Sequence, residues 1–243
     1  MRLRPLTRSD GPVLRELKAR NRSWLSRWEA TVPPGDHNGP ISYRHMVRML
    51  HGEAVQGRML PFAVDFAGPA PSGTAPASTS GAASDSAPGA STASAPVPAQ
   101  RQSRFGAGHR LVGQLTVSGI TWGSLRSANI GYWVDEDCAG RGVIPTAVAL
   151  AVDHCFGVCG LHRVEVCIRP ENLPSRRVAE KLGFREEGIR RAYLHIDGGW
   201  RDHATYALTA DEVPEGMLTR WRALRPIAVP VMAENPPLIR PNE

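Results

Sequence analysis

The sequence has few cysteines, no zinc-binding pattern and no long apolar run, and each absence narrows the class of protein. Four cysteines occur among 243 residues, with no C-x-x-C pair and no histidines at zinc-finger spacing, so we expect neither a disulfide framework nor a metal site. No apolar run approaches the roughly 18 residues of a membrane helix, and the first residues alternate arginine with leucine. We therefore expect a cytoplasmic protein without a membrane span or secretory signal.

The basic residues are concentrated near the N-terminus. Residues 1–60 contain 11 lysines and arginines against five acidic residues, so the net charge of +6 belongs to this segment. Basic surfaces attract phosphate backbones, which leaves a ribosome- or RNA-associated binding module as one interpretation. The chain contains no motif that combines aromatic and basic residues for RNA, so direct nucleic-acid binding is not expected as its main function.

A segment of low complexity interrupts the chain. Apart from Asp85 and Val97, residues 67–99 are all Ala, Gly, Pro, Ser or Thr, a composition that cannot offset the entropy cost of ordering. The runs on either side, 60–66 and 110–120, have the pattern of strands, so we expect this segment to replace the turn of a hairpin. The predicted organisation is one domain over 1–212, a disordered insert at 67–108 and a loose proline-rich tail at 213–243.

Hydrophobic periodicity predicts a fold of both helices and strands. Apolar residues at 43, 46, 47 and 50 recur at helical spacing, and short apolar or alternating runs bounded by turn residues indicate strands. The order of these elements indicates a mixed sheet with helices packed on it. The predicted strands are 2–6, 60–66, 110–120, 128–134, 163–168, 192–196 and 200–208, and the predicted helices are 12–19, 24–28, 43–52, 145–156 and 174–182.

The segment from Ile130 to Ala147 carries the clearest chemical signal. A strand is followed by a loop with Gly140 and Gly142, and then by a helix with Pro145 in its first turn, where the missing N–H is harmless. Such a loop lets several backbone N–H groups point the same way at the positive end of a helix, which makes an anion site suited to phosphate. The loop has no lysine for a P-loop, and Pro145 stands where a dinucleotide fingerprint needs its third glycine.

Further short motifs occur in order along the chain. They are Trp24-Leu25-x-x-Trp28-Glu29-x-Thr31, Leu111-Val112-Gly113, Ile130-Gly131-Tyr132-Trp133-Val134, Gly140-x-Gly142, Asn172-x-x-Ser175, Leu182-Gly183-Phe184 and Tyr193-Leu194-x-Ile196-Asp197-Gly198-x-Trp200-x-Asp202-His203. On these motifs the chain resembles the GNAT superfamily of N-acetyltransferases, and within it the RimJ/RimL type, the RimJ branch in particular. The resemblance covers residues 1–66 and 109–212. It implies an α/β (α+β) GNAT acyl-CoA N-acyltransferase fold, with a mixed twisted sheet and helices on both faces.

The resemblance also implies acetyl-CoA as the cosubstrate and assigns the phosphate-binding residues. The backbone amides of Arg141, Gly142 and Val143, and those on to Thr146, would hold the pyrophosphate, and the Thr146 hydroxyl would add one bond. One departure is visible, because Asp137 and Ala139 stand where the family often has Gln or Arg. That difference leaves backbone binding intact and removes a side-chain contact to phosphate.

Two central strands, 128–134 and 163–168, are implied to splay apart so that the pantetheine arm enters between them. The arm would pair with backbone groups at Trp133, Val134 and Asp135, and an amide there would hold the developing oxyanion. Asn172 would bind the arm, and Ser175 would act as the acid near the sulfur. Both residues also suit a purely structural part, because they begin the helix after the second strand.

The catalytic base is open between two residues. Glu165 lies on the second splayed strand, and Tyr193 lies where the resemblance places residues that face the amine. A glutamate ion-paired with arginine and a core tyrosine are the structural alternatives. Asp202 and His203 are adjacent on a strand, which sends their side chains to opposite faces, so we favour a structural role for that pair.

Together these observations predict an enzyme. The predicted activity is transfer of acetyl to the N-terminal α-amine of a protein, of the alanine or serine type, with a ribosomal protein or ribosome as the expected partner. The amine attacks directly in a ternary complex. A polyamine or aminoglycoside acetyltransferase is an alternative from the same chemistry, and a monomer or homodimer both remain open.

Overall fold

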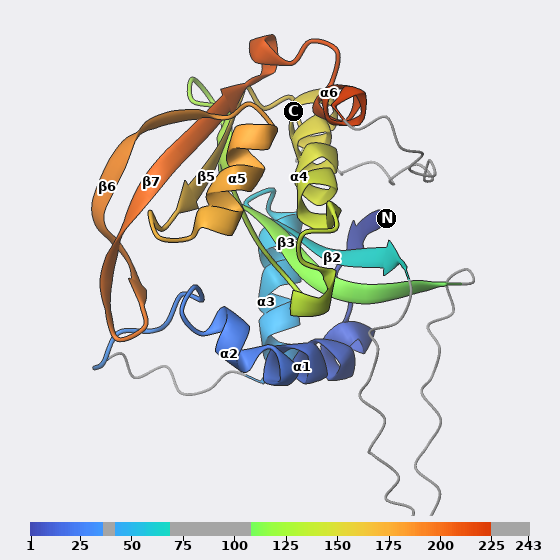
Figure 1. Ribbon diagram of the computed structural model, residues 1–243, viewed down its shortest axis with the longest axis vertical. Coiled ribbons are helices and arrows are strands. Elements are labelled where there is room, and N and C mark those ends of the chain that lie inside the picture. The colour runs from blue at the N-terminus through green and yellow to red at the C-terminus, as the bar shows by residue number, and fades with distance from the viewer. Residues whose placement is uncertain (36–41, 69–107, 225–243) are drawn as a thin grey trace, which may run out of the picture.

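A computed structural model describes residues 1–35, 42–68 and 108–224 of the chain. Over these residues it contains a twisted seven-stranded sheet with strand order β1-β2-β3-β4-β5-β7-β6 (Figure 1). All neighbouring strands are antiparallel except β4 and β5, so the sheet is mixed as predicted. The strands are β1 (Arg2–Pro5), β2 (Leu60–Ala67), β3 (His109–Thr121), β4 (Ser127–Val134), β5 (Arg163–Ile168), β6 (Arg185–Ile196) and β7 (Gly199–Thr209).

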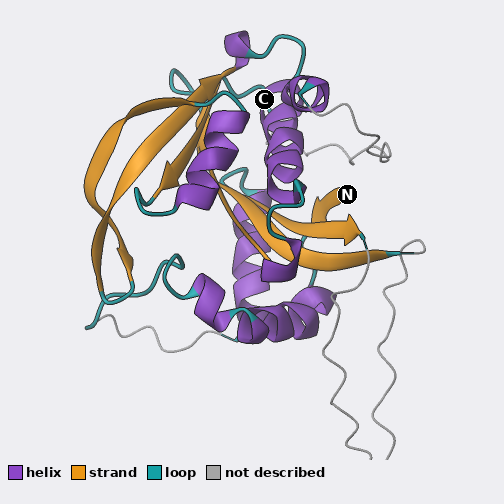
Figure 2. Ribbon diagram, in the orientation of Figure 1, coloured by secondary structure: helices purple, strands orange, loops and turns teal. Residues whose placement is uncertain are grey.

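Helices cover both faces of this sheet (Figure 2). No helix of the described residues is long and apolar enough to cross a membrane. The helices are α1 (Gly11–Arg20), α2 (Arg22–Leu25), α3 (Tyr43–Val55), α4 (Val143–Asp153), α5 (Leu173–Lys181) and α6 (Met217–Ala223). Single 3₁₀ turns lie at Arg8–Asp10, Glu136–Cys138 and Ala210–Glu212, and a π turn at His154–Val158 extends α4.

The two faces are buried by alternate residues of the same strands. On β2, Val64 joins the core beneath α4, whereas the adjacent Ala63 joins a smaller core with Leu14 and Leu17 of α1 and Val47 of α3. This is the period of two that a strand buried on both faces requires. The prediction of helices on both faces is confirmed.

The strands β4 and β5 lie side by side for only three residue pairs. Ser127, Ala128 and Asn129 pair with β5 in parallel register, and beyond Asn129 the two strands diverge. The remainder of β4, Ile130 to Val134, keeps its antiparallel partner β3 but has no pairing with β5. The predicted splay is therefore confirmed.

The hairpin around the low-complexity segment is also confirmed at its base. Ala67, at the end of β2, pairs with His109 at the start of β3 in antiparallel register. The predicted insert itself lies outside the described residues over 69–107. The division of the chain into a domain, an insert and a tail stays a prediction.

The start of the predicted loose tail is wrong. Residues 213–224 fold back on the sheet domain, and Met217 and Trp221 of α6 are buried against α4. Asp153, at the end of α4, accepts hydrogen bonds from the backbone N–H groups of Met217 (2.6 Å) and Leu218 (3.0 Å). These bonds replace the partners that the first N–H groups of a helix lack. Residues 225–243 lie outside the described part of the chain.

The strand β6 begins earlier than predicted. Its first seven residues, Arg185–Arg191, are charged or exposed in almost every position, so they show no apolar alternation. They pair with β7 at the edge of the sheet and are stabilised by ion pairs, such as those of Glu187 with Arg163 and Arg185. Composition alone cannot predict such an edge strand, because its stability comes from residues distant in sequence.

Candidate active site

One large cleft, of about 1680 Å³, opens beside the diverging strands. Its loop side is formed by the segment Ala139–Pro145 and by α5, and its hairpin side by residues Trp24–Ala30 and by β6 and β7. The free edge of β4 and the end of β5 form the floor between the two sides. The cleft therefore brings together most of the motifs that the sequence singles out.

The loop before α4 presents a row of backbone donors. Gly140 (φ +72°) and Gly142 (φ +79°) have left-handed backbone conformations, and Gly142 is the N-cap of α4. The N–H groups from Arg141 to Ile144 have no hydrogen-bond acceptor in the described part of the chain. Since they lie at the N-terminus of an 11-residue helix, they form the anion site that the glycines predict.

The Thr146 prediction is wrong with respect to its hydroxyl. The Thr146 Oγ1 donates to the carbonyl oxygen of Gly142 (2.8 Å) and accepts from Trp221 Nε1 (2.9 Å). Because a hydroxyl has one proton to donate, none remains for a phosphate oxygen, which only accepts. The Thr146 N–H also bonds Gly142 (3.2 Å), so this residue anchors α6 to α4.

The end of β4 lies open to the cleft through Trp133 and Val134. Gly113 of β3 faces them, and a Cβ at that position would overlap the carbonyl oxygen of Trp133, which explains the glycine of the Leu-Val-Gly motif. Their backbone groups stay predicted partners for an extended ligand.

Asp135 does not fit the predicted role. Its N–H already donates to Val112 (2.7 Å), and its carbonyl accepts from Cys138 (2.8 Å). Its carboxylate is 1% exposed, pairs with Arg20 and accepts from Asn21 Nδ2 (2.9 Å). Asp135 thus fixes the end of α1 to the end of β4, and sequence proximity to the loop does not reveal this.

Asn172 and Ser175 both line the cleft at the start of α5. The Asn172 Oδ1 accepts from the Ser175 N–H (3.2 Å), so the structural reading of Asn172 as an N-cap is correct. The Ser175 hydroxyl makes no hydrogen bond within the described residues. Tyr132 donates to the Ser175 carbonyl (3.4 Å), and burial raises the pKa of this tyrosine. Ser175 therefore keeps a free proton donor inside the cleft.

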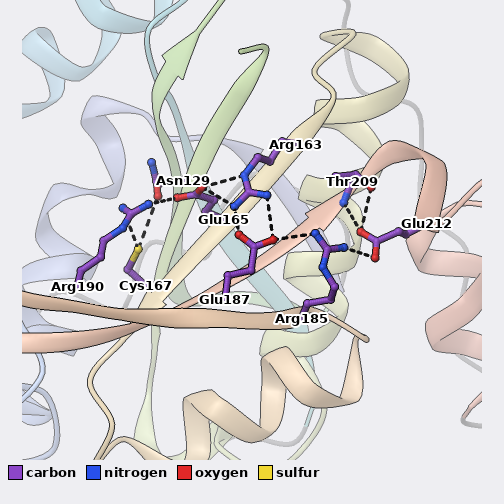
Figure 3. Close-up of polar contacts among 9 residues, drawn as sticks. All are labelled: Asn129, Arg163, Glu165, Cys167, Arg185, Glu187, Arg190, Thr209 and Glu212. Carbon is purple, nitrogen blue, oxygen red and sulfur yellow. Dashed lines mark hydrogen bonds and ion pairs between the residues drawn. The ribbon is translucent and has the colours of Figure 1, made fainter.

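Glu165 is not placed to act as a base. One carboxylate oxygen accepts from Arg163 Nε (2.8 Å) and the other from Arg190 Nη2 (2.5 Å), as Figure 3 shows. Arg163 also pairs with Glu187, so Glu165 belongs to a chain of ion pairs across β5 and β6. Among the described residues it does not line the cleft. The ion-paired alternative is the correct one.

Tyr193 is one layer removed from the cleft wall. Its hydroxyl accepts from Arg190 Nη1 (3.1 Å), and its ring packs edge-on against His203 with 5.5 Å between centroids. Its sequence neighbour Leu194 and its packing partner His203 both line the cleft, whereas Tyr193 itself does not. Its proposed contact with the amine is therefore not supported by the geometry.

His203 is the cleft residue that sequence reasoning set aside. Alternation along β7 does separate it from Asp202, whose carboxylate accepts from the Ala192 N–H (2.8 Å) and pairs with Arg191. Asp202 is structural as expected, since it caps the bulge of β6 at Ala192 (φ +46°). The opposite face, which carries His203, is the wall of the cleft. Because alternation along the strand sends Asp202 and His203 to opposite faces, the sequence already indicated that the two residues have different surroundings.

The hairpin side is rich in cations and held by side-chain contacts. The Trp28 ring has the guanidinium of Arg27 at 4.9 Å and that of Arg169 at 5.4 Å, and Arg169 Nη1 donates to the Arg27 carbonyl (2.8 Å). Thr31 binds His195 of β6 through both its N–H (2.8 Å) and its hydroxyl (2.7 Å to Nδ1). The segment after α2 is thereby attached to the β6–β7 hairpin.

The fold and the cleft define an acetyltransferase of the GNAT type, and the chain belongs to this family. Residues 95–185 match the model of the acetyltransferase (GNAT) domain. A solved structure of Mycobacterium smegmatis RimJ in complex with CoA-disulfide is 32% identical, with a TM-score of 0.68, over 91% of this chain and 88% of that one.

Two curated relatives share shorter stretches. The probable N-acetyltransferase YjcK of Bacillus subtilis (strain 168) is 43% identical over 41% of this chain. The [ribosomal protein uS5]-alanine N-acetyltransferase of Escherichia coli (strain K12) is 31% identical over 44% of this chain. In each case the match spans 55% of the relative's length, about half of it.

Proposed function

We propose that this chain is an acetyl-coenzyme A dependent N-acetyltransferase that acetylates the N-terminal α-amine of a protein. The observation that carries the proposal is the divergence of β4 from β5 within a cleft that ends at a row of N–H groups with no acceptor among the described residues. An extended thioester can lie between the separated strands while its phosphates meet those donors. Bound acetyl-coenzyme A would supply the acetyl group as this thioester.

The residues on the loop side fit such a ligand. The N–H groups of Arg141 to Ile144 lie at the N-terminus of α4, which is the positive end of the helix dipole. A bound pyrophosphate is stabilised most at that end. Arg177 and Lys181 of α5 also line the cleft and form no ion pair with the described residues. The RimJ structure from M. smegmatis, whose description names coenzyme A, supports the same assignment. Ser175 would protonate the departing thiolate.

The acceptor is proposed from the hairpin side. Arg27, Arg169 and Lys18 line that part of the cleft; Lys18 pairs with Glu29 and Arg169 with Glu171, whereas Arg27 has no ion pair among the described residues. The remaining positive charge disfavours a polyamine. A single α-amine on a peptide carries one charge, which it loses before it attacks. Two E. coli relatives, one named for uS5-alanine and one for ribosomal-protein-serine acetylation, support an alanine or serine N-terminus of a ribosomal protein, and hence a cytoplasmic site of action.

A direct assay tests this function. The purified chain is incubated with acetyl-coenzyme A and N-terminal peptides that begin with Ala, Ser, Gly or Pro, with spermidine and an aminoglycoside as competing amines. We expect thiol release together with acetylated Ala or Ser peptides. Thiol release with spermidine alone would move the function to small amines, and no release with any acceptor would contradict the enzyme assignment.

A further inference from the structure

The proposed reaction needs a group that takes the proton of the acceptor amine, and the described residues leave few choices. An α-amine has a pKa near 8, so only about a tenth of it is neutral at pH 7. Both oxygens of Glu165 are held by arginines, and the Tyr193 hydroxyl accepts from Arg190. Glu29, on the hairpin side, is paired with Lys18, and the other lining carboxylates, Glu136 and Glu180, lie on the loop side, away from the acceptor. His203 is the one histidine among the described residues that line the cleft.

His203 lies where the two sides of the cleft meet. The adjacent Ala204 pairs with Ile168, the last residue of β5, so His203 lies just beyond the point where β5 ends. Leu194, Ile196 and Arg169 line the same wall. This places the ring between the diverging strands, where a thioester would lie, and the segment after α2, which would hold the acceptor.

One hydrogen bond fixes which ring nitrogen carries the proton. The Nδ1 of His203 lies 3.1 Å from the carbonyl oxygen of Arg201. A carbonyl only accepts, so Nδ1 must be the protonated nitrogen of the neutral ring. The lone pair is then on Nε2, which has no hydrogen-bond partner in the part of the chain that the structure describes.

The surroundings keep this ring neutral. The side chain is 3% exposed, and burial, aided by the nearby charge of Arg169, lowers the pKa of His203 below its ordinary value of 6.5. Glu171 and Asp202 oppose this shift, and the Arg201 carbonyl does so too. The Tyr193 ring packs edge-on against the imidazole. A neutral imidazole is ready to accept a proton at the pH of the cell.

We infer that His203 is the general base of the proposed transfer, taking a proton from the acceptor ammonium at Nε2. The neutral amine then attacks the thioester carbonyl, the new C–N bond forms, and the C–S bond breaks with the electron pair leaving on sulfur. The attacking nitrogen then loses its second proton to Ser175 as the Ser175 hydroxyl gives its own proton to the departing thiolate, so the amide and the free thiol form together. The imidazolium returns its proton to water. The inference rests on the proposed function, so turnover and acetyl-coenzyme A binding by the unmodified enzyme are measured first.

The variant that tests it is His203→Asn. Its amide can still donate to the Arg201 carbonyl, so the local fold is retained, but it has no basic nitrogen. We expect kcat at pH 7 to fall roughly tenfold or more, because only amine that is already neutral reacts. The acidic limb of the kcat profile should move from below 6.5 to about 8, and the difference from the unmodified enzyme should vanish near pH 9. Acetyl-coenzyme A affinity should stay unchanged.

His154→Asn is the matched control. His154 is also buried, with a pKa lowered by burial, but it lies in the π turn after α4, away from the cleft. Its replacement should change neither kcat nor the pH profile. If His203→Asn does not fold, the unmodified enzyme still decides the matter. The acidic limb of its kcat profile is measured with peptides whose α-amines differ in pKa. A limb that stays below pH 6.5 for all of them supports His203 as the base, and a limb that shifts with the pKa of the amine overturns the inference.

The inference is also overturned if folded His203→Asn keeps both the rate and the acidic limb of the unmodified enzyme. A lower melting temperature with an unchanged pH profile would mean that His203 has only a structural role.

Discussion

The loop side of the cleft is formed mainly by backbone groups, whereas the hairpin side is formed by side chains from distant parts of the chain. On the loop side, two glycines place several N–H groups without acceptors among the described residues at the N-terminus of a buried apolar helix. On the hairpin side, Arg169 contacts Trp28, and Thr31 binds His195. A backbone site can be predicted from local sequence, but a side-chain site depends on contacts that only the fold creates.

Behind the cleft, Asp135 joins the end of α1, which leads to the hairpin side, to the end of β4, which leads to the loop side. Its carboxylate binds Arg20 and Asn21 at the end of α1, and its backbone continues β4 toward the glycine loop. The Asn21 side chain also accepts from the Glu136 N–H (2.8 Å). A change on one side can therefore reach the other through this junction.

The largest expected effect comes from Gly142→Val, which breaks the loop side alone. A β-branched residue is strained at a φ of +79°, so the N–H groups at the start of α4 would turn away from their common point. We expect acetyl-coenzyme A affinity to fall by about 100-fold or more, measured by calorimetry. Gly123→Val is the matched control, with φ +72° and open space around it, and it should leave affinity unchanged. Equal loss in both variants would contradict the anion site.

Asp135→Ala is expected to have the next largest effect, because it disconnects the two sides. Removal of one partner from a buried polar cluster should lower the free energy of unfolding by about 3 kcal/mol, measured by urea denaturation. Glu53→Ala, which breaks the solvent-screened pair with Arg58, should lower the free energy of unfolding far less than Asp135→Ala does. A similar loss in the two variants would show that Asp135 is not a special junction.

Thr146→Val sharpens the assignment of the loop side. The variant removes the hydrogen bond from the Trp221 N–H to the Thr146 hydroxyl, which should cost about 1 kcal/mol in unfolding free energy. Because the hydroxyl already donates its proton to the Gly142 carbonyl, acetyl-coenzyme A affinity should change by less than about twofold. A large loss of affinity in a folded variant would restore the original phosphate role of Thr146.

The smallest effect concerns the ion pairs behind the hairpin side. Hydrogen bonds from Arg163 and Arg185 lower the pKa of Glu187 from 4.5 to about 2. A carboxyl whose pKa is lower in the folded than in the unfolded chain stabilises the fold at pH values above its unfolded pKa. This contribution is lost as the pH falls toward the folded pKa of about 2. Glu187→Gln should therefore have a slightly lower melting temperature than the unmodified chain above pH 5, and the gap should close near pH 2. A gap independent of pH would contradict the pairing.

The same contrast explains what the sequence could predict. Local patterns predicted the strands, the hairpin across the insert and the glycine loop, because periodicity and turn chemistry are encoded within a few residues. The splay of the two central strands was implied by the family resemblance. They did not predict α6, whose helix depends on Asp153 and Thr146, or the pairing of Glu165 with Arg190. His203 was set aside because its exposure to a cleft depends on β5, β6 and the segment after α2.

The central claim is that the cleft transfers acetyl from acetyl-coenzyme A to a protein α-amine. It is tested most directly by mass spectrometry of two peptides of one sequence, one with a free alanine N-terminus and one with that N-terminus blocked and a lysine retained. The account predicts acetylation, with matching thiol release, of the free α-amine only. Equal acetylation of the blocked peptide at lysine, or acetylation of neither, would contradict it.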